Sequence, residues 1–213
     1  VAAQAAIALP DLLLGLWLTG VATAAVLTLL AHHRGVARFG RLSAKGETLR
    51  AAHNGLGPAM IGVLRPRLVL PADFEARFDA REQALILAHE AHHARFGDTR
   101  INGLVSVVCC LNWFNPLVHL AAFLLRVDQE LACDAAVVER FPGERRTYAQ
   151  ALLKSQLACV PLPLGCTWPG RSPHLLQERL TMLAFKTPGR TRLLAGGALV
   201  ATLCLGTAAV AWA

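Results

Sequence analysis

The chain alternates between long uncharged stretches and segments in which charged residues are frequent. Leu12 to Ala31 is a run of about twenty residues without a charge, long enough to cross a bilayer as a helix. Leu193 to Ala213 is a second run of this kind, rich in the small residues that favour close helix packing. The pattern predicts a transmembrane helix with its flank in residues 1–33, a charged domain in 34–192 and a second transmembrane helix in 193–213.

Residues Asp79 to Asp98 predict a buried helix at the centre of the charged domain. Asp79, followed three residues later by Glu82, forms a capping box that begins the helix. The next turns are apolar on most sides, which is typical of a helix inside a core. Phe96-Gly97-Asp98 indicates the end of this helix and the cap of another one.

The predicted helix carries the pattern H-E-x-x-H as His89, Glu90 and His93. Residues at i and i+4 share a helix face, so the two imidazoles can bind one zinc ion. Glu90 can then act as general base on a water bound there. The same pattern also occurs by chance on exposed helices, but here the apolar flank would bury three polar side chains that nothing else satisfies.

A second polar pair with helical spacing follows downstream. Glu130 and Asp134 share a face, and they would complete a zinc site with Glu130 as the third ligand and Asp134 behind an imidazole to orient it. The single tyrosine, Tyr148, lies on an amphipathic helix predicted over 144–158. It is a candidate donor to the transition state, although many helical tyrosines simply pack.

Residues 101–125 form a third uncharged run between these two polar pairs. A single membrane crossing there would leave Glu130 and His89 on opposite sides of the bilayer, and arginines flank both ends of the run. The segment is therefore a hairpin that enters and returns, broken near Asn115-Pro116, or a helix that is buried or lies along the surface. His119 within it is either an extra ligand or donor, or a polar residue that faces another helix.

The remaining pattern predicts one β region and one further helix. Residues 53–71 combine turn signals with two short apolar runs, which predict a small sheet of two or three strands whose edge can pair with an extended peptide. Residues 34–50 are basic and partly helical in pattern, whereas 160–173 read as a loop and 174–185 as a helix.

Charge and composition favour a membrane protein over a nucleic-acid binder. The net charge is +7 and the mean hydropathy +0.44, and all 21 Lys and Arg lie between Arg34 and Arg192. This distribution is typical of a cytoplasmic segment between membrane spans, and no basic, aromatic-rich motif indicates direct nucleic-acid binding. The six cysteines include no C-x-x-C pair, which favours reduced thiols in the cytoplasm.

Three segments together resemble the BlaR/MecR-type antirepressor metallopeptidase family: HEAHHARFGD, WFNPLVHL and QELACDAAV. The resemblance implies a bacterial membrane protein with a cytoplasmic zinc peptidase domain. Carried over by position, His89, His93 and Glu130 would bind Zn²⁺, Glu90 would be the base and Asp134 the carboxylate behind the ligands. The implied substrate is a regulatory protein such as a transcriptional repressor, or the protein itself. No S-x-x-K motif of a penicillin-binding sensor is present.

We therefore expect a mainly α-helical, multi-pass membrane protein. Its α+β, gluzincin-like zinc protease domain would hold a small β-sheet between transmembrane helices, and its partners would be a protein substrate and the lipid bilayer. Two alternatives remain: a non-catalytic zinc-containing transducer that docks a partner, and a quality-control protease of the HtpX type, which shares H-E-x-x-H.

Overall fold

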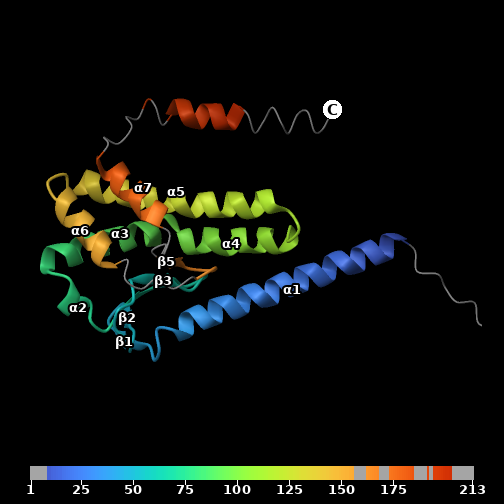
Figure 1. Ribbon diagram of the computed structural model, residues 1–213, viewed down its shortest axis with the longest axis horizontal. Coiled ribbons are helices and arrows are strands. Elements are labelled where there is room, and N and C mark those ends of the chain that lie inside the picture. The colour runs from blue at the N-terminus through green and yellow to red at the C-terminus, as the bar shows by residue number, and fades with distance from the viewer. Residues whose placement is uncertain (1–8, 156–161, 168–172, 185–190, 192–193, 203–213) are drawn as a thin grey trace, which may run out of the picture. The chain divides into compact units, whose positions relative to one another are not determined.

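The computed structural model describes residues 9–155, 162–167, 173–184, 191 and 194–202. Contacts divide the chain into two units, Val1–Leu183 and Ala184–Ala213. Helices α1 to α7 and strands β1 to β5 lie in or at the end of the first unit (Figure 1). In the second unit residues 194–202 are helical, and the rest of the span predicted over 193–213 lies outside the described residues.

Helix α1 (Leu9–Ala37) contains the first predicted span. Its leucines are exposed, and among the described residues it is the one helix long and apolar enough to cross a membrane. The expected multi-pass arrangement is therefore wrong for the described chain. Of the second predicted span, over 193–213, the structure describes only residues 194–202 as helical.

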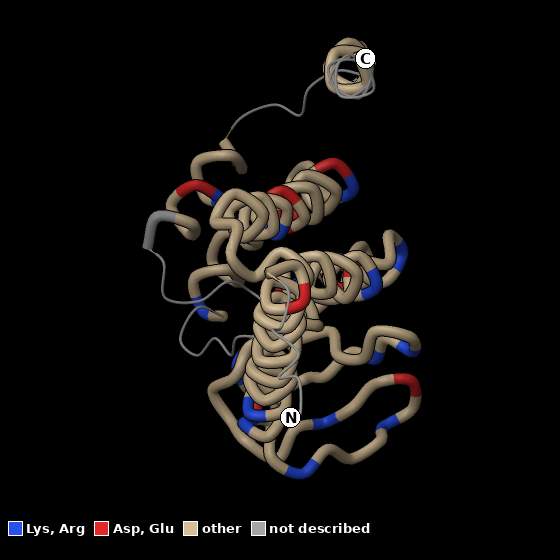
Figure 2. Tube along the Cα trace, turned by 90° about the vertical axis from the view of Figure 1, so that its right-hand side faces the viewer, with Lys and Arg blue, Asp and Glu red and all other residues tan. Residues whose placement is uncertain are grey.

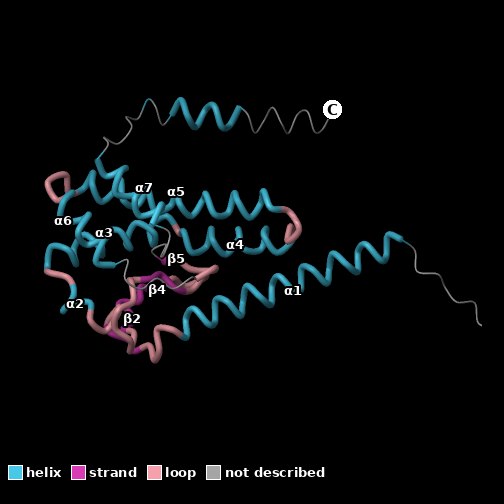
Figure 3. Tube along the Cα trace, viewed as in Figure 1, coloured by secondary structure: helices cyan, strands magenta, loops and turns pink. Residues whose placement is uncertain are grey.

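Helices α4 (Asp98–Leu111) and α5 (Pro116–Arg140) form an antiparallel hairpin (Figures 1 and 3). The Asn115 side chain accepts a hydrogen bond from the Leu117 amide and caps α5, while Pro116 occupies its first turn. At 1.5 Å per residue α4 is about 21 Å long, less than the bilayer core of about 30 Å. Of the alternatives for residues 101–125, the structure agrees with the hairpin broken near Asn115-Pro116, and α5 returns to the side that carries the polar residues.

The sheet is larger than predicted. Strands β1 (Ser43–Lys45), β2 (Thr48–Arg50), β3 (Ala59–Ile61), β4 (Arg67–Leu70) and β5 (Cys166–Thr167) lie in the order β1-β2-β4-β3-β5. All neighbours are antiparallel except β2 and β4, which are parallel. The predicted strands correspond to β3 and β4. The sequence pattern missed β1 and β2, and the edge of β3 pairs with the chain's own β5. Figure 2 shows Lys and Arg along the strands and loops of this sheet.

Helix α3 (Ala80–Phe96) contacts α5, α6 (Arg145–Ser155), α4 and the short α2 (Phe74–Arg77), and α1 contacts α4. Apolar side chains of β4, α2, α3, α5 and α6 share one core with Leu183 of α7 (Pro173–Ala184). A second core under the sheet contains Phe39, Leu49 and Val69. The predicted helices over 144–158 and 174–185 correspond to α6 and α7.

Candidate metal centre

Local sequence signals fix both ends of the motif helix α3. The Asp79 carboxylate accepts the backbone amides of Arg81 and Glu82, and the Glu82 carboxylate accepts the amide of Asp79, so the capping box is present. Gly97 ends the helix at φ +71°, a left-handed conformation that favours glycine. The motif lies in the last two turns of a well-defined helix.

His89, Glu90 and His93 are all buried, although they are the polar residues of the motif. The close packing of α3 against α5 places Glu130 opposite the two imidazoles. Nε2 of His89 lies 3.4 Å from Oε2 of Glu130, and Nε2 of His93 lies 3.4 Å from Oε1 of the same carboxylate. The predicted ligands His89, His93 and Glu130 are thus brought together.

This spacing matches the ligand shell of a tetrahedral ion. Bonds of about 2.0–2.1 Å at tetrahedral angles separate neighbouring ligand atoms by about 3.4 Å. Among the described residues, Nε2 of His93 is buried without a hydrogen-bond partner, as expected for an atom whose partner is a metal ion. Two imidazole nitrogens and a carboxylate oxygen are the donor set that zinc favours. These residues therefore fit a zinc ion.

The opposite nitrogen of each imidazole is held by an outer group. Nδ1 of His93 lies 2.7 Å from Oδ2 of Asp98. Nδ1 of His89 lies 2.8 Å from the hydroxyl of Tyr148, which donates to Oδ1 of Asp134 at 2.6 Å. Because the hydroxyl proton points to Asp134, its oxygen accepts the Nδ1 proton of His89. Such partners fix the tautomer and the orientation of metal-binding histidines, so both Nε2 atoms present lone pairs to the space beside Glu130.

Arg179 of α7 is the cation of the centre. Its Nε and Nη2 donate to the two oxygens of Asp134, each at 2.7 Å, and its Nη1 lies 3.1 Å from Oε2 of Glu130. The whole side chain is buried. A buried guanidinium is tolerated only with close anionic partners, and here two carboxylates of α5 supply them.

These contacts determine the electrostatics of the carboxylates. Burial by itself raises the pKa of Glu130, but Arg179 and the two imidazoles hold that pKa well below its usual range. The pKa of Asp134 is depressed in the same way, since Arg179 outweighs the effect of burial. Both groups are therefore anionic at neutral pH.

The pKa values of the two imidazoles are shifted in the opposite direction, above the usual value. Burial lowers the pKa of His93, yet its bonds to Asp98 and Cys133 and the charge of Glu130 raise it well above the usual value. The pKa of His89 is also raised, by Asp134 and Glu130 against the effect of burial. The carboxylates around the two imidazoles therefore stabilise positive charge at this place.

Two cysteines lie close to the centre. Sγ of Cys133 is 3.3 Å from Nδ1 of His93, and it forms with His89 and His93 a second buried group able to hold a metal ion. Cys133, however, lies on the Nδ1 side of His93, where Asp98 is already bound, whereas Glu130 faces both Nε2 atoms. We favour Glu130 as the third ligand on this geometry. Burial, with the charges of nearby carboxylates, raises the pKa of the Cys166 thiol to about 12.

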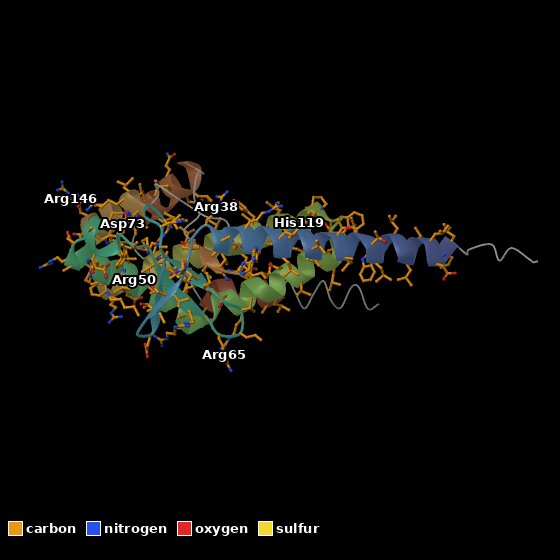
Figure 4. The ribbon with its side chains drawn as sticks, turned by 90° about the horizontal axis from the view of Figure 1, so that it is seen from below. Arg38, Arg50, Arg65, Asp73, His119 and Arg146 are labelled. Atoms are coloured by element: carbon orange, nitrogen blue, oxygen red, sulfur yellow. The ribbon has the colours of Figure 1, made fainter. Side chains whose placement is uncertain are left out.

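Two predicted residues lie away from the Nε2 side of the imidazoles. Tyr148 holds Nδ1 of His89, so its contacts favour an orienting role, and its role as transition-state donor stays a prediction. His119 lies on the hairpin, apart from Asp73 and Arg50 of the sheet region, and its Nε2 is 3.2 Å from the carbonyl oxygen of Trp113 (Figure 4). Its contact agrees with a polar residue that faces a neighbouring segment.

Sequence reasoning missed Asp98 and Arg179. Asp98 was expected to cap the next helix, but Gly97 occupies that position and Asp98 turns its carboxylate to His93. A signal was present, because Asp98 follows His93 by five residues across a glycine turn. Arg179 had no comparable signal: it lies 45 residues from Asp134, on a helix that reads as apolar and amphipathic.

Comparison of the sequence with those of known proteins places this chain in a family. The profile of the family described as BlaR1 peptidase M56 matches residues 3–183. The chain belongs to this peptidase family. The regulatory protein BlaR1 of Bacillus licheniformis is 30% identical to it over 153 residues, which are 70% of this chain and 25% of that protein. The methicillin resistance MecR1 proteins of Staphylococcus aureus and Staphylococcus epidermidis are 26% identical over 114 residues, 53% of this chain and 20% of theirs.

Membership of the M56 peptidases confirms the family resemblance drawn from the sequence. It also implies a metal, and the residues around Glu130 suit one. The chain spans about a quarter or less of the length of these relatives. What the whole proteins do is therefore a matter for proposal.

Proposed function

We propose that this M56 peptidase is a zinc endopeptidase in a membrane-associated regulatory pathway, with its active site on the cytoplasmic side. One observation carries the proposal: both Nε2 atoms of the H-E-x-x-H histidines lie 3.4 Å from the oxygens of one carboxylate, and both Nδ1 atoms are held from behind. A docking scaffold has no need of such a set together with Glu90.

The residues divide the chemistry among them. His89, His93 and Glu130 would hold zinc, which when bound polarises the scissile carbonyl and favours deprotonation of the attacking water. Glu90, the next residue after His89 and buried like it, accepts the proton of that water and passes it to the departing amine nitrogen. Asp98, Tyr148 and Asp134 keep the imidazoles in the required tautomer. The substrate we propose is a regulatory protein, such as a transcriptional repressor, or the chain itself.

We also propose that the bilayer is the partner of α1 and of the α4–α5 hairpin. Both expose large apolar side chains that no described part of the protein covers. On the hairpin these are Ile101, Leu104, Val107, Val108, Leu111, Trp113, Phe114, Leu117, Leu120, Phe123 and Leu124. Contiguous apolar surface on this scale marks a contact with a membrane or another protein, and the absence of charge from 101 to 125 favours acyl chains.

The test compares the wild-type protein with Glu90→Gln, both purified in detergent. Bound zinc per chain is measured by atomic absorption, and cleavage is followed on the protein itself and on a co-expressed repressor from the same operon. Equal zinc with cleavage in the wild type only is expected. Zinc bound by neither protein would refute the metal centre, and cleavage by Glu90→Gln at the wild-type rate would refute the role of Glu90.

A further inference from the structure

Arg179 contacts the outer side of the centre through three different nitrogens. Nε and Nη2 donate hydrogen bonds to the two oxygens of Asp134, and Nη1 forms an ion pair with Oε2 of Glu130 at 3.1 Å. Asp134 and Glu130 are four residues apart on α5, so their carboxylates share one face of that helix. One planar guanidinium therefore fixes both carboxylates at once, which a lysine ammonium, a single point charge on a flexible stem, does not reproduce.

The ion pair between Arg179 and Glu130 distinguishes the two oxygens of that carboxylate. Each oxygen lies 3.4 Å from one imidazole Nε2, so by distance alone either oxygen, or both together, is in a position to bind an ion between the imidazoles. The contact with Arg179 involves Oε2 and leaves Oε1 to the ion. A carboxylate held in this way would bind an ion through Oε1 alone, and a four-coordinate ion would then keep a position for water.

Arg179 also completes a chain of hydrogen bonds and an ion pair, here called the circuit, that links the proposed ligands His89 and Glu130. His89 donates to Tyr148, Tyr148 donates to Asp134, Asp134 accepts from Arg179, and Arg179 contacts Glu130. Every member of this circuit is buried. The orientation of one ligand is thereby tied to that of another through groups that do not face the ion.

We propose that Arg179 is a positioning residue that holds Glu130 in one-oxygen coordination, so that the metal centre is complete only when α7 is docked. This inference rests on the proposed metallopeptidase function. Helix α7 docks through Leu176, Leu180 and Leu183, which pack on the main core, and Arg179 lies on the same helix. Any event that moves α7 removes the guanidinium from the centre.

In the wild-type protein, zinc binding and the docking of α7 should be thermodynamically coupled. If docking of α7 favours zinc binding, zinc must favour docking of α7 by the same factor, because the coupling of two binding equilibria is reciprocal. Hydrogen exchange of the backbone amides of α7 is measured with and without Zn²⁺, with β1 and β2 as the internal reference. Zinc is expected to slow exchange in α7 and to leave the reference strands unchanged.

Two variants test whether the guanidinium of Arg179 holds Glu130 in one-oxygen coordination. Arg179→Lys keeps the positive charge but loses the planar guanidinium with its several N–H donors. Arg146→Lys is the matched control, because it makes the same change at an exposed position of α6 (Figure 4). Zinc affinity is measured by competition with a chelator, and coordination by the visible spectrum of the Co²⁺-substituted protein. For Arg179→Lys we expect roughly 10- to 100-fold weaker binding and a spectrum of higher coordination number, because Glu130 binds through both oxygens. Arg146→Lys should match the wild type.

The outcomes separate this inference from the proposed function. A wild-type protein that binds no Zn²⁺ refutes the metal centre itself. A wild type that binds Zn²⁺, together with an Arg179→Lys protein of equal affinity and identical cobalt spectrum, refutes the role of Arg179 alone. If Arg179→Lys does not fold, the exchange experiment decides: slowing in α3 and α5 without slowing in α7 overturns the proposal.

Discussion

The hydroxyl oxygen of Tyr148 lies 2.8 Å from Nδ1 of His89, while Nε2 of the same ring lies 3.4 Å from Glu130. The tyrosine thus holds the imidazole from the side remote from the ion position. Tyr148 is itself buried and donates to Asp134. These contacts favour a role in orienting His89, a proposed metal ligand.

Tyr148→Phe should weaken both zinc binding and the fold. The substitution keeps the packed ring but leaves the Nδ1 proton of His89 without its acceptor. We expect roughly tenfold lower zinc affinity and a loss of about 1–3 kcal/mol in the free energy of unfolding. Chelator competition and urea denaturation measure the two effects. If Tyr148 instead donates to the transition state, the zinc affinity will stay at the wild-type value while kcat falls.

The third ligand is the subject of a second prediction, because Glu130 and Cys133 both lie near the histidines. Glu130 faces the two Nε2 atoms, whereas Cys133 lies beside Nδ1 of His93. Glu130→Gln should therefore abolish stoichiometric zinc binding, and Cys133→Ala should retain it. The Co²⁺-substituted wild type should lack the near-ultraviolet charge-transfer band of a thiolate ligand. A strong thiolate band, lost in Cys133→Ala, would replace the proposed ligand set with two histidines and a cysteine.

Asp98 provides a third prediction, since its carboxylate holds Nδ1 of His93 at 2.7 Å. Asp98→Asn keeps the size of the side chain and removes its charge. Roughly 10- to 100-fold weaker zinc binding is expected, as is usual when the carboxylate behind a histidine ligand is lost. Asp128→Asn on α5 is the matched control, because Asp128 is exposed. Equal zinc affinities for the two variants would show that Asp98 does not orient His93.

The sequence was most informative where function and structure depend on local spacing. The capping box at Asp79, the end of α3 at Gly97 and the pairs His89/His93 and Glu130/Asp134 are all patterns within one helix, and each was placed correctly on its element. A topological argument excluded a single membrane crossing by residues 101–125, because Glu130 and the histidines could not then meet, and the broken hairpin was one of the alternatives that it left.

What was missed depends on contacts between distant segments. β1 and β2 are three residues each, too short for their alternation to be distinguished from a basic amphipathic pattern. The multi-pass expectation rested on a second span over 193–213, and among the described residues only α1 is long and apolar enough to cross a membrane. Arg179 was missed because nothing near it in the sequence marks a buried guanidinium; its partners lie on α5.

The hairpin supports a fourth prediction, which concerns its contact with lipid. Trp113 lies between α4 and α5, and Leu117 in the first turn of α5 is 71% exposed. If acyl chains cover this surface, bilayers of brominated lipid will quench the fluorescence of Trp113, obtained as the difference between the wild type and Trp113→Phe.

A charge placed on the hairpin tests that contact. Leu117→Lys should reduce the quenching of Trp113, because a lysine in the apolar layer costs up to about 3 kcal/mol. Leu64→Lys, at a leucine in the β3–β4 turn that is 83% exposed, introduces the same charge outside the hairpin and should leave the quenching unchanged. Quenching that is absent in the wild type, or unaffected by Leu117→Lys, would show that a surface other than the bilayer covers the hairpin. The apolar residues 101–125 would then form a protein interface.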